Sequence, residues 1–86
     1  MVEVHLYGDL RRFAENKAVD GDSIAWASWQ SGDTVQTVLT RMGIDLARDV
    51  SNVFINGTYV YRAGGAPIQD TARLGVFPKN MSALYI

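Results

Sequence analysis

Residues 35–42 have the apolar spacing of an amphipathic helix, and this segment constrains the fold of the 86-residue chain more than any other. The apolar residues recur at the i, i+3, i+4 and i+7 positions of one helix face and are Val35, Val38, Leu39 and Met42. Asp33 or Thr34 can cap the first amides, and Gln36 fits a capping box after Asp33. Gly43 can end the helix in a left-handed conformation. The sequence therefore predicts one helix, Val35–Met42.

Short segments on both sides of this helix alternate in polarity or are rich in β-branched and aromatic residues, which predicts strands. They are Val2–Tyr7, Ser23–Trp29, Val53–Ile55, Tyr59–Tyr61 and Arg73–Phe77. The first two are expected to pair antiparallel. Asn56-Gly57 supplies the positive φ values of a type I′ turn, which predicts a hairpin between the third and fourth. Asp9–Gly21 is expected to be a loop with a short turn around Leu10–Phe13, and Asp45–Ser51 to be irregular.

One helix among short strands predicts an α+β domain, in the order strand, strand, helix, strand, strand, strand. The helix would cover one face of a mixed sheet of four to five strands. Residues 1–86 are expected to form this single domain, because so short a chain can build only one core.

Composition excludes several classes of function. The chain has no cysteine, which removes disulfides, a thiolate nucleophile and cysteine-ligated zinc or iron–sulfur clusters. A formal net charge of -1, with acidic and basic residues interspersed, gives no basic surface for nucleic acid. The apolar run Ile24–Ala27 is far shorter than the roughly 20 residues that cross a bilayer. Because Val2-Glu3-Val4 does not resemble a secretion signal either, we expect a cytoplasmic protein that binds neither nucleic acid nor membrane.

No residue pattern indicates a catalytic centre, a metal site or a cofactor. His5 is the only histidine and lies within a predicted strand, without a cysteine or second histidine to share a metal. Arg11-Arg12 could contact an anion, but adjacent arginines in a polar loop are usually solvated. Cleavage after Gly64-Gly65 would leave a chain that ends in Gly-Gly, but it would also remove the last predicted strand. The glycine pair is therefore expected to be part of a flexible loop. The chain is therefore not expected to be an enzyme.

Aromatic residues of the predicted strands indicate a protein-binding surface. If the even-numbered residues of the first strand face the helix, alternation places three aromatic side chains on the opposite face: Tyr7, Phe54 and Phe77. Either Trp26 or Trp29 joins them, because residues three apart on a flat strand lie on opposite faces. An uncovered aromatic surface is typical of an interaction site. The alternative is that the apolar C-terminal segment folds back and covers it.

The last six residues carry four large apolar side chains, Met81, Leu84, Tyr85 and Ile86. A free tail would expose them to water at about 25 cal/mol per Å². The sequence therefore predicts that Met81–Ile86 is ordered, either as an added edge strand or across a dimer interface. With Tyr7, Phe54 and Phe77, these four residues make up the predicted partner-binding set.

Five fragments carry a family resemblance: Val2–Gly8, Gly32–Val35, Val53–Gly57, Ile68–Asp70 and Arg73–Pro78. In their order and spacing they resemble the small sulfur-carrier family that includes the MoaD-type subunit of molybdopterin synthase and the ThiS-type carrier of thiamine synthesis. The resemblance implies a β-grasp, or ubiquitin-like, fold. It also implies a larger partner, either a synthase-type or an activating-enzyme-type subunit.

The chain departs from that family after Phe77-Pro78. Family members end in a free Gly-Gly three residues later, whose carboxylate is adenylated and converted to a thiocarboxylate. Here Ser82-Ala83 takes that place and the chain continues to Ile86. Side chains there would obstruct the threading into a partner's active site that glycine allows.

Two hypotheses follow from this departure. The first is a non-catalytic ubiquitin-like protein of this family that binds a larger partner, or a second copy, through its sheet face and C-terminal segment. The alternative is a sulfur carrier in molybdopterin or thiamine biosynthesis with an atypical or trimmed tail.

Overall fold

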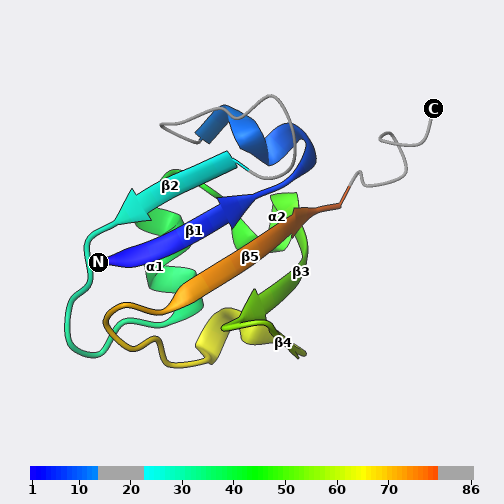
Figure 1. The fold of residues 1–86 in the computed structure, drawn as a ribbon. Coiled ribbons are helices and arrows are strands. Elements are labelled where there is room, and N and C mark those ends of the chain that lie inside the picture. Colours follow the sequence, from blue (N-terminus) through cyan, green and yellow to red (C-terminus); the bar gives the residue numbers. More distant parts are fainter. Residues whose placement is uncertain (14–22, 80–86) are drawn as a thin grey trace.

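The centre of the fold is a parallel pair of strands, β1 (Val2–Leu6) and β5 (Arg73–Pro78). On one side β2 (Ser23–Ala27) pairs antiparallel with β1. On the other side β3 (Val50–Ile55) pairs antiparallel with β5, and β4 (Thr58–Val60) with β3. The resulting five-stranded mixed sheet has the order β2-β1-β5-β3-β4 (Figure 1). The chain is therefore an α+β domain, as the sequence predicted.

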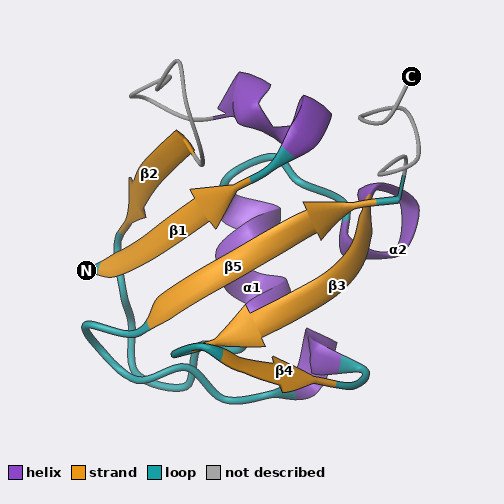
Figure 2. Ribbon diagram, turned by 45° about the vertical axis from the view of Figure 1, so that its right-hand side comes forward, coloured by secondary structure: helices purple, strands orange, loops and turns teal. Residues whose placement is uncertain are grey.

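The computed structural model describes residues 1–13 and 23–79. Helix α1 (Val35–Arg41) lies against one face of the sheet, behind β1 and β5 in Figure 2. The other helical segments are short: α2 (Leu46–Asp49) and the 3-10 turns η1 (Gly8–Phe13) and η2 (Ala63–Gly65). The predicted order of Met81–Ile86 lies outside the described residues. Within the described ranges no helix is long and apolar enough to span a membrane.

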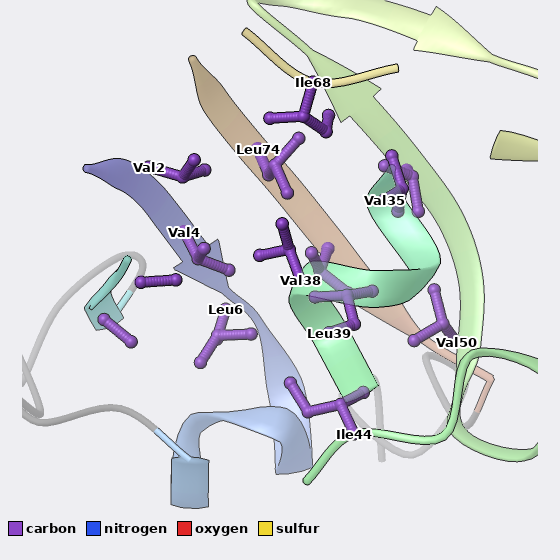
Figure 3. Close-up of a cluster of buried hydrophobic side chains, with 14 of the residues drawn as sticks. Val2, Val4, Leu6, Val35, Val38, Leu39, Ile44, Val50, Ile68 and Leu74 are labelled. Carbon is purple, nitrogen blue, oxygen red and sulfur yellow. The ribbon is translucent and has the colours of Figure 1, made fainter. Parts of the chain in front are cut away.

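The core lies between α1 and the two central strands (Figure 3). Val4 pairs in register with Leu74, so their side chains reach the same face of the sheet. The residues of β1, β5 and α1 that are 0% exposed are Val2, Val4, Leu6, Leu74, Val76, Val35, Val38 and Leu39. The alternation and the helical stripe of the sequence are therefore confirmed.

The N-terminal cap of α1 is one of the two residues that the sequence predicted, but the capping box differs. Thr34 is the N-cap residue: its side chain accepts a hydrogen bond from the Thr37 amide at 3.3 Å, and Thr37 Oγ1 accepts one from the Thr34 amide at 2.9 Å. The predicted box of Asp33 with Gln36 is wrong, because the reciprocal pair is shifted by one residue.

The C-terminal end of α1 is the left-handed stop that the sequence predicted. Gly43 has φ 88, and the Ile44 amide donates to the Leu39 carbonyl at 2.9 Å. The Gly43 amide donates to Thr40 at 3.0 Å, which completes a Schellman motif and buries Ile44. Met42 is the C-cap, so the helix ends one residue before the predicted boundary.

Asp33 is buried beside α1 and anchors the turn that precedes the helix. Its carboxylate forms an ion pair with Arg41 and accepts hydrogen bonds from the Gln30 amide at 2.8 Å and from Thr37 Oγ1 at 2.9 Å. The Arg41 guanidinium and the Gln30 amide lower the pKa of Asp33 below its usual value. Asp33 therefore links the turn to both ends of α1.

This network predicts an acid-labile contribution to stability. Because the pKa of Asp33 is lower in the folded than in the unfolded chain, its contribution is complete above about pH 5 and is lost as the pH falls through the folded pKa. Asp33→Asn is expected to lower the urea midpoint at pH 7 and to flatten its decline below pH 5. The control Asp9→Asn alters an exposed carboxylate and should leave that pH profile unchanged. Parallel profiles of wild type and Asp33→Asn would contradict the assignment.

Short helical turns occur in the two segments that connect the predicted strands and helix. The short turn predicted around Leu10–Phe13 is the 3-10 turn η1, which begins earlier, at Gly8, and whose Leu10 is buried against the core. Within Asp45–Ser51 the structure has α2, followed directly by β3. Asp45 Oδ1 accepts the Arg48 amide at 3.1 Å, and this cap holds the single turn of α2.

Strand ends also differ from the prediction. β2 ends at Ala27 rather than Trp29, because the Trp29 side chain turns back to the domain, where its Nε1 donates to the Ile68 carbonyl at 2.7 Å. β4 is Thr58–Val60, so Tyr61 falls outside it. The Asn56-Gly57 turn is confirmed, with φ 51 and 83.

Candidate functional site

Three aromatic residues that were predicted to share the face opposite α1 lie together there. The rings of Tyr7 and Phe77 are stacked, with centroids 4.2 Å apart and an interplanar angle of 7°. Phe54 meets Phe77 edge-on at 5.5 Å and 66°. The strand neighbours of Phe54 and Phe77 in the core, Val53 and Val76, point to the α1 side and leave these rings on the other face. All three rings are half-buried, so each keeps an exposed part.

Tyr59 extends this cluster and was missed at the sequence level. It pairs with Phe54 across the hairpin, with ring centroids 5.6 Å apart at 61°, and is 49% exposed. The two-residue Asn56-Gly57 turn fixes that register, so the contact could have been read from the sequence. We call Tyr7, Phe54, Tyr59 and Phe77 the aromatic patch.

A notch opens in the aromatic patch at Gly75. On β5 this glycine pairs with His5 of β1 and with Phe54 of β3, and it places no side chain between them. The resulting pocket of about 370 Å³, the Gly75 notch, is lined by residues that include His5, Tyr7, Phe54, Arg73, Gly75 and Phe77. Sequence reasoning did not single out Gly75.

The shape of the notch comes from the missing side chain and not from a strained backbone. A Cβ atom at residue 75 would lie 3.6 Å from Phe54 Cβ and 3.9 Å from the nearest ring atoms of Phe77 and Tyr7. These are ordinary contact distances, and Gly75 does not have a positive φ. A small side chain is therefore compatible with the fold here, and it would occupy the notch.

A histidine–carboxylate contact and an arginine lie beside the notch. On one flank His5 Nε2 contacts the Glu3 carboxylate, so these two side chains are partners of each other. Arg73 is exposed at the end of β5, next to Glu3 in the register of β1 and β5. Within residues 1–13 and 23–79 the Arg73 side chain forms no ion pair. The rim of the notch therefore presents Arg73, which has no carboxylate partner among the described residues.

The two tryptophans have different environments. Trp26 is 50% exposed and is paired with Glu3, so alternation places it on the same face as the aromatic patch, out on β2. It makes no ring contact with the patch residues in the part of the chain that the structure describes. Trp29 packs against the core. Trp26 is therefore the exposed one of the two.

The other sequence candidates do not assemble into a site. Arg11 Nε donates to Ser23 Oγ at 3.1 Å, while Arg12 donates to the Asp9 carbonyl at 2.7 Å, so the two arginines have separate partners. Gly64-Gly65 lies in η2, where a Cβ on Gly64 would come within 3.0 Å of Leu46. Among the described residues no cluster of histidine and carboxylate groups could hold a metal ion.

The predicted partner-binding residues Met81, Leu84, Tyr85 and Ile86 fall outside the described residues, so only the sheet-face part of that set has a described geometry. Comparisons with protein-family models, with curated proteins and with solved structures find no match. The sulfur-carrier resemblance therefore stays a hypothesis that rests on the sequence fragments.

Proposed function

We propose that this chain is a non-catalytic, cytoplasmic binding domain of the β-grasp type and that its aromatic patch docks onto a partner protein. The observation that carries the proposal is the cluster of four rings on the sheet face opposite α1, with Tyr59 half exposed at its edge. Aromatic side chains are enriched at the energetic centres of protein interfaces. Rings that are already packed against one another lose little further conformational entropy on binding.

The topology supports the β-grasp part of this proposal. The β-grasp fold is expected to have a parallel central pair of strands with antiparallel neighbours. It is also expected to have one main helix between the second and third strands of the chain, and this chain has both features. The resemblance fragments Val2–Gly8, Val53–Gly57 and Arg73–Pro78 also overlap the strands β1, β3 and β5. These fragments contain three of the four patch residues: Phe54 and Phe77 on β3 and β5, and Tyr7 directly after β1. Three of the five resembling fragments therefore contribute to the surface, while Tyr59 on β4 lies outside them.

Site-specific crosslinking in cells of the native host tests the docking surface. A photoreactive phenylalanine analogue at position 59 is expected to give an adduct of defined mass, because Tyr59 borders the patch and is exposed. The matched control places the analogue at Gln36, which is exposed on α1 on the other side of the sheet. The position-59 adduct should also be lost in a Phe54→Ala background. Equal adducts from both positions, or an adduct that survives Phe54→Ala, would contradict the proposal.

Intact mass separates this function from the alternative, a sulfur carrier in molybdopterin or thiamine biosynthesis. With ATP and a sulfur-carrier activating enzyme, we expect neither an adenylate nor a thiocarboxylate, because Ser82-Ala83 stands where the family has Gly-Gly. A mass increase that corresponds to replacement of one carboxylate oxygen by sulfur would favour the carrier. The same measurement on protein from the native host would also report trimming of the tail.

A further inference from the structure

We propose that the Gly75 notch receives one apolar side chain from a peptide segment of the partner and that Arg73 binds a carboxylate beside that side chain. This inference rests on the proposed function and specifies the chemistry of the partner. The occupant is thus a segment in which an apolar residue adjoins Asp or Glu.

The shape of the notch supports an apolar occupant. Its walls are the rings of Tyr7, Phe77 and Phe54, which are held in place by their mutual contacts. Its width comes from the absence of a side chain at Gly75, between two strands. A side chain that enters displaces water from apolar ring surface, and this transfer is favourable by about 25 cal/mol per Å². A hollow of about 370 Å³ has room for one large side chain.

The charge around the notch supports an acidic neighbour. Arg73 lines the notch, and no acidic residue is among the described residues that line it. The nearest acidic strand neighbour is Glu3, whose carboxylate contacts His5 Nε2 and forms no ion pair with Arg73. A guanidinium presents a planar set of donors that matches a carboxylate in two parallel hydrogen bonds. A segment with Asp or Glu beside its apolar anchor would supply that carboxylate.

The probe is a random peptide library displayed on phage and selected against the full chain. Enriched peptides are expected to share an apolar residue next to Asp or Glu, and to shift backbone amide signals of β1, β3 and β5 in NMR spectra. Exchanging Asp for Asn in the peptide should weaken binding to the wild type by ~10-fold. The variant Arg73→Met keeps the apolar stem of the arginine. Its affinities for the Asp peptide and the Asn peptide should differ by less than ~2-fold.

Two further variants test the notch itself. Gly75→Leu should abolish binding by filling the hollow. Gly75→Ala, whose Cβ has only ordinary contacts, keeps the test valid if the leucine variant does not fold, and it should weaken binding by ~3-fold or more. Arg48→Met is the matched control for Arg73→Met, because Arg48 is an exposed arginine on α2 and does not line the notch. It should leave the affinity unchanged.

The outcomes separate this inference from the proposed function. Peptides that shift the patch amides but lack an acidic residue, or that bind Arg73→Met as tightly as wild type, would overturn the inference and leave the docking surface intact. Peptides that perturb only other surfaces, together with a failed crosslink at position 59, would overturn both. A dimer that dissociates in Gly75→Leu would identify a second copy as the occupant and would also overturn the inference.

Discussion

Leu39→Ala is expected to lower the free energy of unfolding by about 2–5 kcal/mol. Leu39 is 0% exposed and lies on the face of α1 that meets the central strands, so its removal leaves a cavity in the only large core of the described domain (Figure 3). A domain of this size has a small total stability, so a loss in the upper half of that range would remove a large share of it.

Urea denaturation, followed by far-UV circular dichroism, measures this effect, with Thr40→Ala as the control. Thr40 is the next residue of α1 and is exposed, so its replacement should change stability by less than about 0.5 kcal/mol. An equally small loss for Leu39→Ala would mean that Leu39 is exposed and that the helix lies against the sheet by a different face.

The helix and the sheet could be predicted because each has a local pattern that tertiary contacts reinforce. The stripe of α1 ends at Gly43, whose positive φ allows the Ile44 amide to reach the Leu39 carbonyl. Alternation along β1 and β5 gave the buried faces. The Asn56-Gly57 turn fixed the hairpin register, and with it the contact between Phe54 and Tyr59. In each case the structure follows from residues that lie a few positions apart, or from a pattern that repeats regularly along the chain.

The parts that could not be predicted depend on contacts between distant residues. α2 is only four residues long, and the segment around it is held by the Lys79 amide, which donates to the Asp49 carbonyl at 3.1 Å. The end of β2 depends on the hydrogen bond from Trp29 to Ile68, thirty-nine residues away. Neither contact leaves a local pattern in the sequence.

The Gly75 notch shows the same limit at the candidate site. In the sequence Gly75 is one small residue within a strand. It becomes a hollow only because β1 and β3 place His5 and Phe54 on either side of it. Alternation did place Tyr7, Phe54 and Phe77 on one face, but it could not give their ring contacts or the space between them.

Phe77→Ala is expected to weaken partner binding by about 2 kcal/mol or more, roughly 30-fold in the dissociation constant. The ring of Phe77 contacts two other patch rings, stacking on Tyr7 and meeting Phe54 edge-on. Its loss removes one wall of the Gly75 notch and leaves Tyr7 and Phe54 without the ring that both of them contact. The free energy of unfolding should fall by only about 1–2 kcal/mol, because the Phe77 ring is only half-buried and faces away from the core.

The control for this prediction is Tyr61→Ala. Tyr61 is 71% exposed, lies just beyond β4 and has no ring contact with Phe54 or Phe77 among the described residues. Isothermal titration with the partner identified by crosslinking should show wild-type affinity for Tyr61→Ala and the large loss for Phe77→Ala. Urea denaturation of both variants separates lost contacts from lost fold. If Phe77→Ala kept wild-type affinity while losing stability, the patch would be a second, smaller packing cluster and the partner would bind elsewhere.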